Sequence, residues 1–216
     1  MAGLIAGVDE VGRGAWAGPL VVGAVILDPT QPIEGLADSK SLTPARRTTL
    51  ARVIRKRAIS YAYGIVLIDE FNEIGLARAL HVARARAIAQ LKPRPKEIIC
   101  DGLGSHAIGH IATRYIIAAD ATIPQVSAAA TIAKVYRDNL MRALGNQYPA
   151  FGFDQHKGYG TPQHRRAIER HGICMMHRIH FAPIKNRLLN KSNRAVMLKY
   201  ENIGCGGLTD QDAAIS

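Results

Sequence analysis

The sequence predicts an α/β protein, with a mixed central sheet flanked by helices and a helical C-terminal part. Short apolar runs of strand length alternate with longer segments in which apolar residues recur at helical spacing. Glycine and proline separate these segments, and the composition, 48% hydrophobic with 20 glycines and 10 prolines, is typical of a globular protein. The order β-β-α-β-α-β-β-α-α therefore indicates one mixed sheet with helices on its faces.

In the first half of the chain, breakers and caps define the expected boundaries. Gly12, Gly14 and Gly18 separate two apolar runs, which favours an antiparallel pair of strands. Thr43-Pro44 is typical of a helix N-cap and first helical position, and Asp69 is expected to cap the next helix. The pattern predicts strands at 4–9, 20–27 and 59–67, and helices at 44–57 and 69–91.

In the second half, Pro93 and Pro95 end the preceding helix, and Thr161-Pro162 opens a helix that ends at Gly172. The pattern predicts strands at 97–100 and 114–118, and helices at 126–144 and 162–172. We therefore expect residues 1–186 to form one domain that includes the helical C-terminal part. Residues 187–216 are expected to form a C-terminal extension that is partly mobile.

The charge balance points to a polyanionic partner. A formal net charge of +11 and a pI near 9.9 suit nucleic acid or an anionic membrane surface. No stretch is apolar and long enough to span a bilayer, so membrane residence is not expected. The widely spaced Cys100, Cys174 and Cys205 form no C-x-x-C pair and indicate neither a zinc site nor a disulfide framework. A cytoplasmic location is expected.

Acidic residues occur where apolar strands are expected to end. Asp9-Glu10, Asp101 and Asp120 each have such a position, and strand ends line the ligand crevice of open α/β sheets. Gathered carboxylates repel one another unless cations neutralise them, and oxygen-only ligands favour magnesium or manganese over zinc. Two such ions, about 4 Å apart, activate water and stabilise a leaving oxygen.

Asp138 is the alternative to Asp120 as a metal ligand. Asp138 falls within an expected helix, where the plain alternative is a salt bridge that orients Arg137 or a neighbouring residue. The strand-end position of Asp120 favours Asp120.

Six sequence blocks, which occur in the family's order and cover residues 4 to about 185, resemble the signatures of ribonuclease HII. They are Gly7-Val8-Asp9-Glu10-Val11-Gly12-Arg13-Gly14, Asp38-Ser39-Lys40, Asp101-Gly102, the run from Ser127 to Asp138, Lys157-Gly158-Tyr159-Gly160-Thr161 and His177-Arg178. The resemblance implies a ribonuclease H-like fold and a metal-dependent endonuclease that acts in ribonucleotide removal from DNA. The expected substrates are RNA–DNA hybrids and duplex DNA with embedded ribonucleotides, cut on the 5′ side of the ribonucleotide to leave 3′-hydroxyl and 5′-phosphate ends.

The resemblance also assigns roles to residues. It makes Asp9, Glu10, Asp101 and Asp120 the catalytic ligands of two Mn²⁺ or Mg²⁺ ions. It assigns recognition of the ribose 2′-hydroxyl to Gly12-Arg13-Gly14 together with Tyr159. Physically, the glycines allow close backbone approach, Arg13 can grip a phosphate with two hydrogen bonds, and Tyr159 can stack on a sugar. Lys40 and Lys134 are expected phosphate contacts, with Asp138 and Arg178 as possible supporting residues.

Other charged residues are expected to be structural or solvated. The basic groups Arg52, Arg55, Lys56 and Arg57, and Arg84 with Arg86, are interpreted as solvated helix faces. Five histidines crowd the C-terminal region: His156, His164, His171, His177 and His180. Zinc is not expected there, because paired histidine spacing beside acids or cysteines is missing. Family members commonly carry Asn at position 156 and Ser at position 180, and His177-Arg178 is expected to make structural or phosphate contacts.

Three other protein classes are alternatives to ribonuclease HII. Ribonuclease HIII usually carries an extra N-terminal substrate-binding domain, whereas here the catalytic strand is expected to begin by Leu4. A catalytically silent nucleic-acid-binding module would be favoured by loss of an acid, but all four positions are filled. A transposase or resolvase-type nuclease would be favoured if Gly12-Arg13-Gly14 and Lys157-Gly158-Tyr159 were missing.

Overall fold

The computed structural model describes residues 4–36 and 42–189. The chain divides into two compact units. The first contains residues 1–13 and 19–137, and the second contains residues 14–18 and 138–216. Lys40 and most of the expected extension at 187–216 lie outside the described residues. No helix within the described ranges combines the length and apolarity that a membrane crossing requires.

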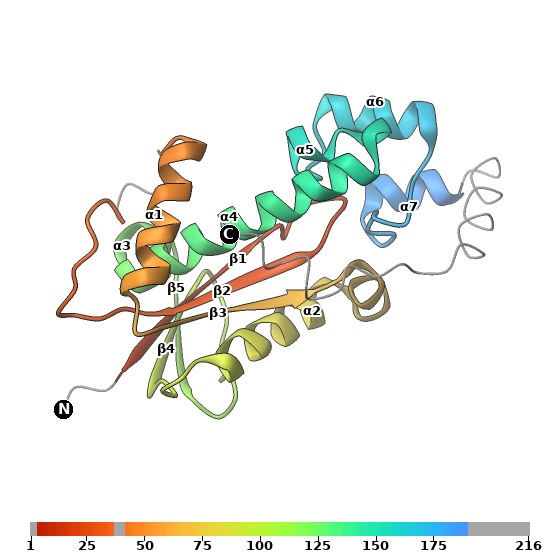
Figure 1. Cartoon of the computed structure of the whole chain (residues 1–216). Helices are drawn as coiled ribbons and strands as arrows, with labels where there is room; N and C mark the ends of the chain where they lie inside the picture. Colours follow the sequence, from red (N-terminus) through yellow and green to blue (C-terminus); the bar gives the residue numbers. More distant parts are fainter. Residues whose placement is uncertain (1–3, 37–41, 190–216) are drawn as a thin grey trace. The chain divides into compact units, whose positions relative to one another are not determined.

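A five-stranded mixed sheet forms the centre of the first unit (Figure 1). Its strands are β1 (Ile5–Val11), β2 (Leu20–Ile26), β3 (Ser60–Val66), β4 (Glu97–Asp101) and β5 (Ala112–Ile116), in the order β3-β2-β1-β4-β5. The β1–β2 and β2–β3 pairs are antiparallel, whereas β1–β4 and β4–β5 are parallel. The expected antiparallel hairpin of β1 and β2 and the mixed sheet are therefore confirmed. The parallel pairing places the carboxyl ends of β1 and β4 at the same edge.

Helices cover both faces of this sheet. They are α1 (Pro44–Arg57), α2 (Ile68–Gln90), the short α3 (Ala119–Thr122) and the first part of α4 (Pro124–Gln147). An ideal Cβ on Gly23 would lie 2.4 Å from the Ala129 carbonyl oxygen of α4, and one on Gly64 would lie 1.8 Å from the Ala83 carbonyl oxygen of α2. Gly64 pairs with Val22, the neighbour of Gly23, and neighbouring strand residues face opposite sides. Because Gly23 and Gly64 have no side chain, α4 and α2 can lie directly on opposite faces of the sheet.

Two boundaries of the first unit differ from the sequence expectation. Asp69 lies in the first turn of α2, while Leu67 is the N-cap and Gly75, at φ 74°, marks a kink in the helix. Strand β5 ends at Ile116, before Ala118 adopts a left-handed conformation, so Asp120 does not terminate a strand. Asp120 instead lies on α3. The prediction of a strand over 114–118 was therefore displaced by two residues.

The second unit is helical and includes a short piece of the N-terminal region. It contains the end of α4, η1 (Pro149–Phe151), α5 (Phe153–His156), α6 (Pro162–His171) and α7 (Ala182–Leu189). Thr161 caps α6, because its hydroxyl oxygen accepts a hydrogen bond from the His164 backbone, which confirms the expected start. Ala17 pairs with His177 in an isolated antiparallel bridge and packs in the core beside Phe153. Residues distant in sequence thus complete this unit.

Candidate active site

Two parallel strands bring the predicted acidic residues together. Val8 pairs with Cys100 across β1 and β4, so Asp9 and Asp101 are the next residues on neighbouring strands. The Asp9 carboxylate accepts a hydrogen bond from the Glu10 backbone at 2.7 Å, and Asp101 accepts one from the Ala119 backbone at 2.8 Å. The second bond ties the end of β4 to the start of α3, which carries the buried Asp120. The sheet edge and α3 thus position all of these acids.

The acids influence one another electrostatically. The pKa of Asp9 is raised to about 8, mainly by burial and also by the charges of Glu10, Asp101 and Asp120, against the lowering effect of the backbone hydrogen bond from Glu10. A carboxyl group in such surroundings favours a nearby cation, which would remove the mutual repulsion. All donors in the group are carboxylate oxygens, which are the ligands that magnesium and manganese prefer. The residues therefore fit hard divalent cations.

The side chains are not arranged as a finished metal cage. Within the described ranges, no three His, Cys, Asp or Glu side chains surround a common metal position. Consecutive strand residues project to opposite faces, so Glu10 faces away from Asp9. One Glu10 oxygen accepts a hydrogen bond from Arg84 of α2 at 2.7 Å, and the side chains are only 10% and 12% exposed.

Arg84 corrects the sequence interpretation of a solvated helix face. Its side chain is mostly buried beside Glu10, because α2 packs on the face of the sheet to which Glu10 projects. Arg86 does lie at the surface, where its guanidinium forms two hydrogen bonds to Glu70, at 2.7 and 2.8 Å. The sequence could not separate the two arginines, since that required the register of α2 on the sheet.

The glycine-bracketed arginine follows β1. Gly12 has φ 89°, and an ideal Cβ there would lie 2.2 Å from Nε of Arg137. Arg137 is fully buried and donates a hydrogen bond from Nε to the Pro19 carbonyl at 2.9 Å, so this arginine is part of the core. Arg13 is different: its side chain is 62% exposed and lies 3.5 Å from Glu10. Gly14 belongs to the second unit and has open space where a Cβ would be.

The loop that carries Tyr159 is held by backbone hydrogen bonds within the second unit. The Gly158 carbonyl accepts hydrogen bonds from Trp16 at 2.8 Å and from Ala17 at 3.3 Å, and the Tyr159 backbone donates to His156 at 3.0 Å. Tyr159 itself is half-buried. The segment after Gly14 and the Tyr159 loop are therefore one packed assembly.

Three of the five C-terminal histidines form a buried cluster behind this loop. His164 and His156 stack with ring centroids 4.4 Å apart, and His164 Nε2 lies 3.1 Å from His177 Nε2. Burial and, to a smaller extent, the neighbouring histidines lower the pKa of His164 to about 4 and that of His177 to about 3. Burial also lowers the pKa of His156. The rings are therefore neutral packing groups at physiological pH.

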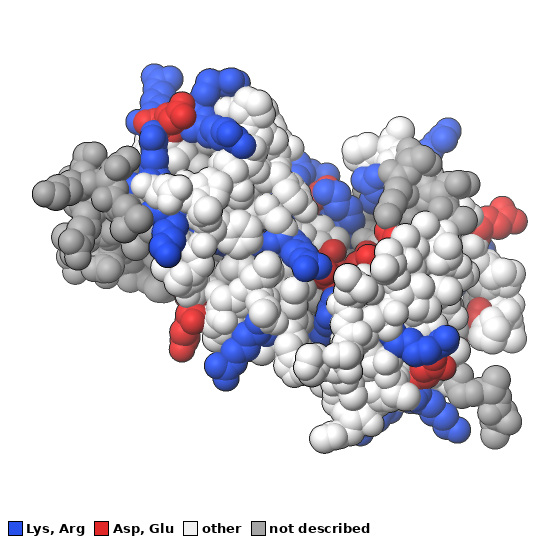
Figure 2. Space-filling model, turned by 180° about the vertical axis from the view of Figure 1, so that it is seen from behind, with Lys and Arg blue, Asp and Glu red and all other residues white. Residues whose placement is uncertain are grey.

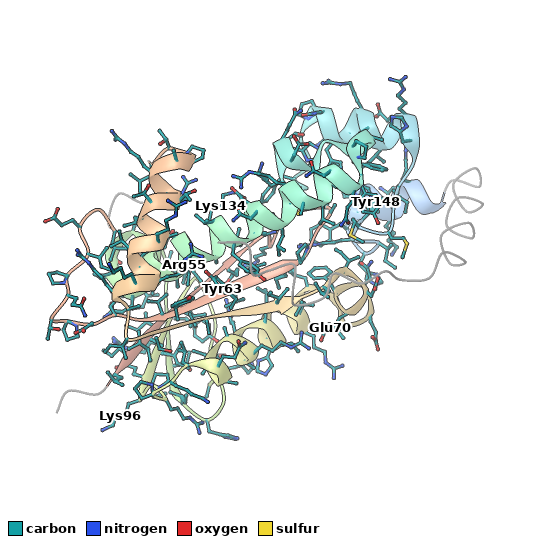
Figure 3. The ribbon with its side chains drawn as sticks, in the orientation of Figure 1. Arg55, Tyr63, Glu70, Lys96, Lys134 and Tyr148 are labelled. Atoms are coloured by element: carbon teal, nitrogen blue, oxygen red, sulfur yellow. The ribbon has the colours of Figure 1, made fainter. Side chains whose placement is uncertain are left out.

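The other basic candidates take different positions. Arg178 is fully buried and donates hydrogen bonds from Nε and Nη2 to the Gly18 carbonyl, at 3.1 and 2.9 Å, which tie it to the backbone at Gly18. Lys134 lies half-buried on α4, and Arg55 lies on α1 (Figure 3). On the face drawn in Figure 2, Lys and Arg side chains are spread widely, whereas Asp and Glu are sparser. Asp138 belongs to the part of α4 in the second unit.

Comparison with known proteins identifies the family. The family model described as Ribonuclease HII matches residues 6–184. The chain is 41% identical over 189 residues to a Ribonuclease HII of Nitrosospira multiformis, covering 88% of this chain and 94% of the relative. It is 44% identical over 185 residues to a Ribonuclease HII of Vibrio campbellii, covering 86% and 87%.

Solved structures agree in fold. The ribonuclease H2 of Pyrococcus horikoshii matches with a TM-score of 0.73 and 28% identity, covering 85% of this chain and 96% of that chain. A Bst-RNase HIII in complex with Mn²⁺ matches with a TM-score of 0.68 and 22% identity, covering 86% and 69%. The expected ribonuclease H-like fold is confirmed by these likenesses. The chain belongs to the ribonuclease HII family and is an endoribonuclease that cleaves RNA in RNA–DNA hybrids and acts in ribonucleotide removal from DNA.

Proposed function

We propose that this chain hydrolyses the phosphodiester on the 5′ side of a ribonucleotide and leaves 3′-hydroxyl and 5′-phosphate ends, with Asp9, Glu10, Asp101 and Asp120 as ligands of two divalent cations. The observation that carries the proposal is the convergence of these acids: Asp9 and Asp101 follow a paired position on neighbouring parallel strands, and the Ala119 bond ties Asp101 to the helix that carries Asp120. The raised pKa of Asp9, caused by burial and by the three neighbouring acids, agrees with this convergence. Four acids gathered at one partly buried sheet edge repel one another, and bound cations would remove that repulsion.

The metal choice follows from the donor set. Carboxylate oxygens suit Mn²⁺ and Mg²⁺, and the Mn²⁺ complex of a Bst-RNase HIII, a protein of the same fold, is consistent with that choice. When bound, such ions lower the pKa of an attacking water and stabilise the departing oxygen. The task of the four carboxylates is to hold the ions. The bond from Ala119 fixes Asp101, and the Glu10 backbone bond fixes Asp9.

Substrate recognition is assigned to the residues around the glycine-bracketed arginine. The exposed guanidinium of Arg13 lies beside Glu10, where it can contact a phosphate next to the scissile bond. The open space at Gly14 allows a sugar to approach the backbone, which is where a 2′-hydroxyl would be sensed. We assign Tyr159 to stacking on that sugar, and Lys134 and Lys40 to phosphates.

A pair of duplexes tests this assignment. One contains a single ribonucleotide, and the matched control is all DNA, each labelled at one end and incubated with Mn²⁺ or Mg²⁺. We expect cleavage only of the first duplex, on the 5′ side of the ribonucleotide. Equal cleavage of both duplexes would contradict recognition of the 2′-hydroxyl, and product ends with a 3′-phosphate would contradict the proposed bond.

A further inference from the structure

Arg84 places a positive charge beside Glu10, on the face of the sheet opposite to α4. Its Nη2 donates to Glu10 at 2.7 Å, and both side chains are nearly buried. Charge-assisted hydrogen bonds are short and strong, and their strength increases where water is excluded. Glu10 is therefore held by an internal cation when no metal is present.

The guanidinium is fixed in this position by its surroundings. Its central carbon lies 5.4 Å from the ring centroid of Tyr115, whose hydroxyl donates to the His106 carbonyl at 3.0 Å. The neighbouring Ala83 packs on Gly64, so the backbone of α2 at this point lies directly on the sheet. Among the described residues, Nε of Arg84 has no hydrogen-bond partner although it is buried. Leaving a buried donor unsatisfied is costly, so the ion pair with Glu10 must compensate for it.

We propose that Arg84 is a positioning residue for the metal site, which holds Glu10 in place before metal binds and thereby sets the affinity of the site for its cations. The proposal rests on the proposed role of Glu10 as a metal ligand. In the metal-free protein, Arg84 neutralises one carboxylate and reduces repulsion among the acids. A metal that takes Glu10 as a ligand competes with this ion pair, so Arg84 weakens metal binding while it stabilises the metal-free fold.

Arg84 is thus expected to stabilise the metal-free fold and to weaken metal binding. This combination distinguishes the proposal from a purely structural role. A residue that only packs would change stability without changing the metal affinity of a folded variant. A residue that helped to gather the ligands would strengthen metal binding, so its loss would weaken it. Arg84 as a competitor predicts lower stability in the absence of metal and tighter binding in its presence.

The test uses Arg84→Met, which keeps an unbranched side chain of similar reach but removes the charge. Arg84→Lys restores the charge, and Arg84→Gln is a polar neutral alternative should the methionine variant not fold. Arg86→Met is the matched control, since Arg86 lies on the same helix but pairs with Glu70 at the surface. Each full-length protein is melted in EDTA and titrated with Mn²⁺ alone by calorimetry.

We expect Arg84→Met to melt at a lower temperature in EDTA and to bind Mn²⁺ roughly five- to tenfold more tightly than the parent, within the range usual for coupled sites. Arg84→Gln should behave likewise, whereas Arg84→Lys and Arg86→Met should keep the parental Mn²⁺ affinity. In a Glu10→Gln background, Arg84→Met should leave Mn²⁺ affinity unchanged, because the Glu10 carboxylate for which Arg84 and Mn²⁺ compete is lost.

Unchanged or weaker Mn²⁺ binding by a folded Arg84→Met or Arg84→Gln protein would overturn the proposal. Failure of the proposed function is a separate outcome, since it would appear in the parent protein as absence of Mn²⁺ binding or of cleavage at a ribonucleotide. Measured Mn²⁺ binding by the parent together with equal affinity in the variants would refute the role of Arg84 alone.

Discussion

His177 and His164 face each other nitrogen to nitrogen, with 3.1 Å between their Nε2 atoms in the interior of the second unit. One assignment of protons satisfies every ring nitrogen of the pair. His164 Nδ1 donates to the Tyr159 carbonyl at 3.0 Å, and His177 Nδ1 accepts from the Cys174 backbone at 2.9 Å. His177 must then donate from Nε2 to His164 Nε2. Both rings are neutral in this arrangement, and protonation of His164 would break the bond between them.

Acid should therefore destabilise the protein through these two rings. Their folded pKa values, about 4 for His164 and about 3 for His177, lie below the ordinary value of 6.5, so the unfolded chain binds more protons as pH falls from 6.5 toward 4. The free energy of unfolding should fall by up to about 1.4 kcal/mol per pH unit for each ring in that range. Urea unfolding at pH 7.5, 6.0 and 5.0 measures the slope.

The test protein is a double variant that carries His164→Gln and His177→Gln. The control is His171→Gln, because His171 is exposed. The double variant should show a flatter dependence on pH between 7.5 and 5.0, and the control should keep the parental slope. An identical slope in all three proteins would show that the buried pair does not govern acid stability.

Gly12→Ala should destabilise the first unit. The residue has φ 89°, and the added Cβ would lie 2.2 Å from the buried Arg137 side chain, so both backbone strain and overpacking act against it. We expect a loss of about 1–3 kcal/mol in the free energy of unfolding, measured by urea titration. Gly35→Ala is the control for backbone strain alone, because Gly35 has φ 79° with open space around it.

Gly14→Ala, in the same motif, should affect substrate binding and leave stability nearly unchanged. Nothing lies within 4 Å of a Cβ at this position, so the free energy of unfolding should stay within about 0.5 kcal/mol of the parent. Under the proposed sugar approach, the added methyl group should raise KM for a duplex with one ribonucleotide. Parental kinetics in Gly14→Ala would argue against close contact between substrate and backbone there.

A pair of matched substitutions distinguishes Asp120 from Asp138 as the metal ligand. Asp120 contributes to the raised pKa of Asp9, and its position on α3 follows the bond between Asp101 and Ala119. We expect Asp120→Asn to lower kcat by more than the 10- to 100-fold typical of residues that only support metal ligands. Asp138→Asn should lower it less. The reverse order of kcat values would make Asp138 the ligand.

The fold was largely predictable because the strands and caps leave local signals. The apolar runs of β1 and β2 around a glycine-rich break, and the Thr161-Pro162 cap of α6, were read from neighbouring residues alone. Asp120 was misplaced because a left-handed Ala118 ends the extended segment, and no sequence pattern marks an alanine for that conformation.

The positions of candidate site residues were predictable where they depend on place along a strand. They were not predictable where they depend on packing between elements. Asp9 and Asp101 follow apolar runs, which predicted their positions at strand ends, and the structure shows that the two strands are parallel neighbours. Arg84, Arg137 and Arg178 gave no comparable signal, because arginines are usually solvated and their burial depends on distant partners. The family-like sequence blocks around Arg137 and Arg178 indicate that these arginines matter, but they do not indicate that the side chains are buried.

The central claim is that the acids at the edge of β1 and β4 hold the metal ions that hydrolysis needs. Its most direct test is the initial rate on a duplex with one ribonucleotide, at saturating Mn²⁺, for the parent and Asp9→Asn. The variant replaces a carboxyl group whose ionised form is disfavoured by burial and by its acidic neighbours with a neutral amide of the same shape, so it should fold at least as stably in EDTA. We predict a rate more than about 100-fold below that of the parent, with the fold retained by circular dichroism. A parental rate in the folded variant would contradict the account.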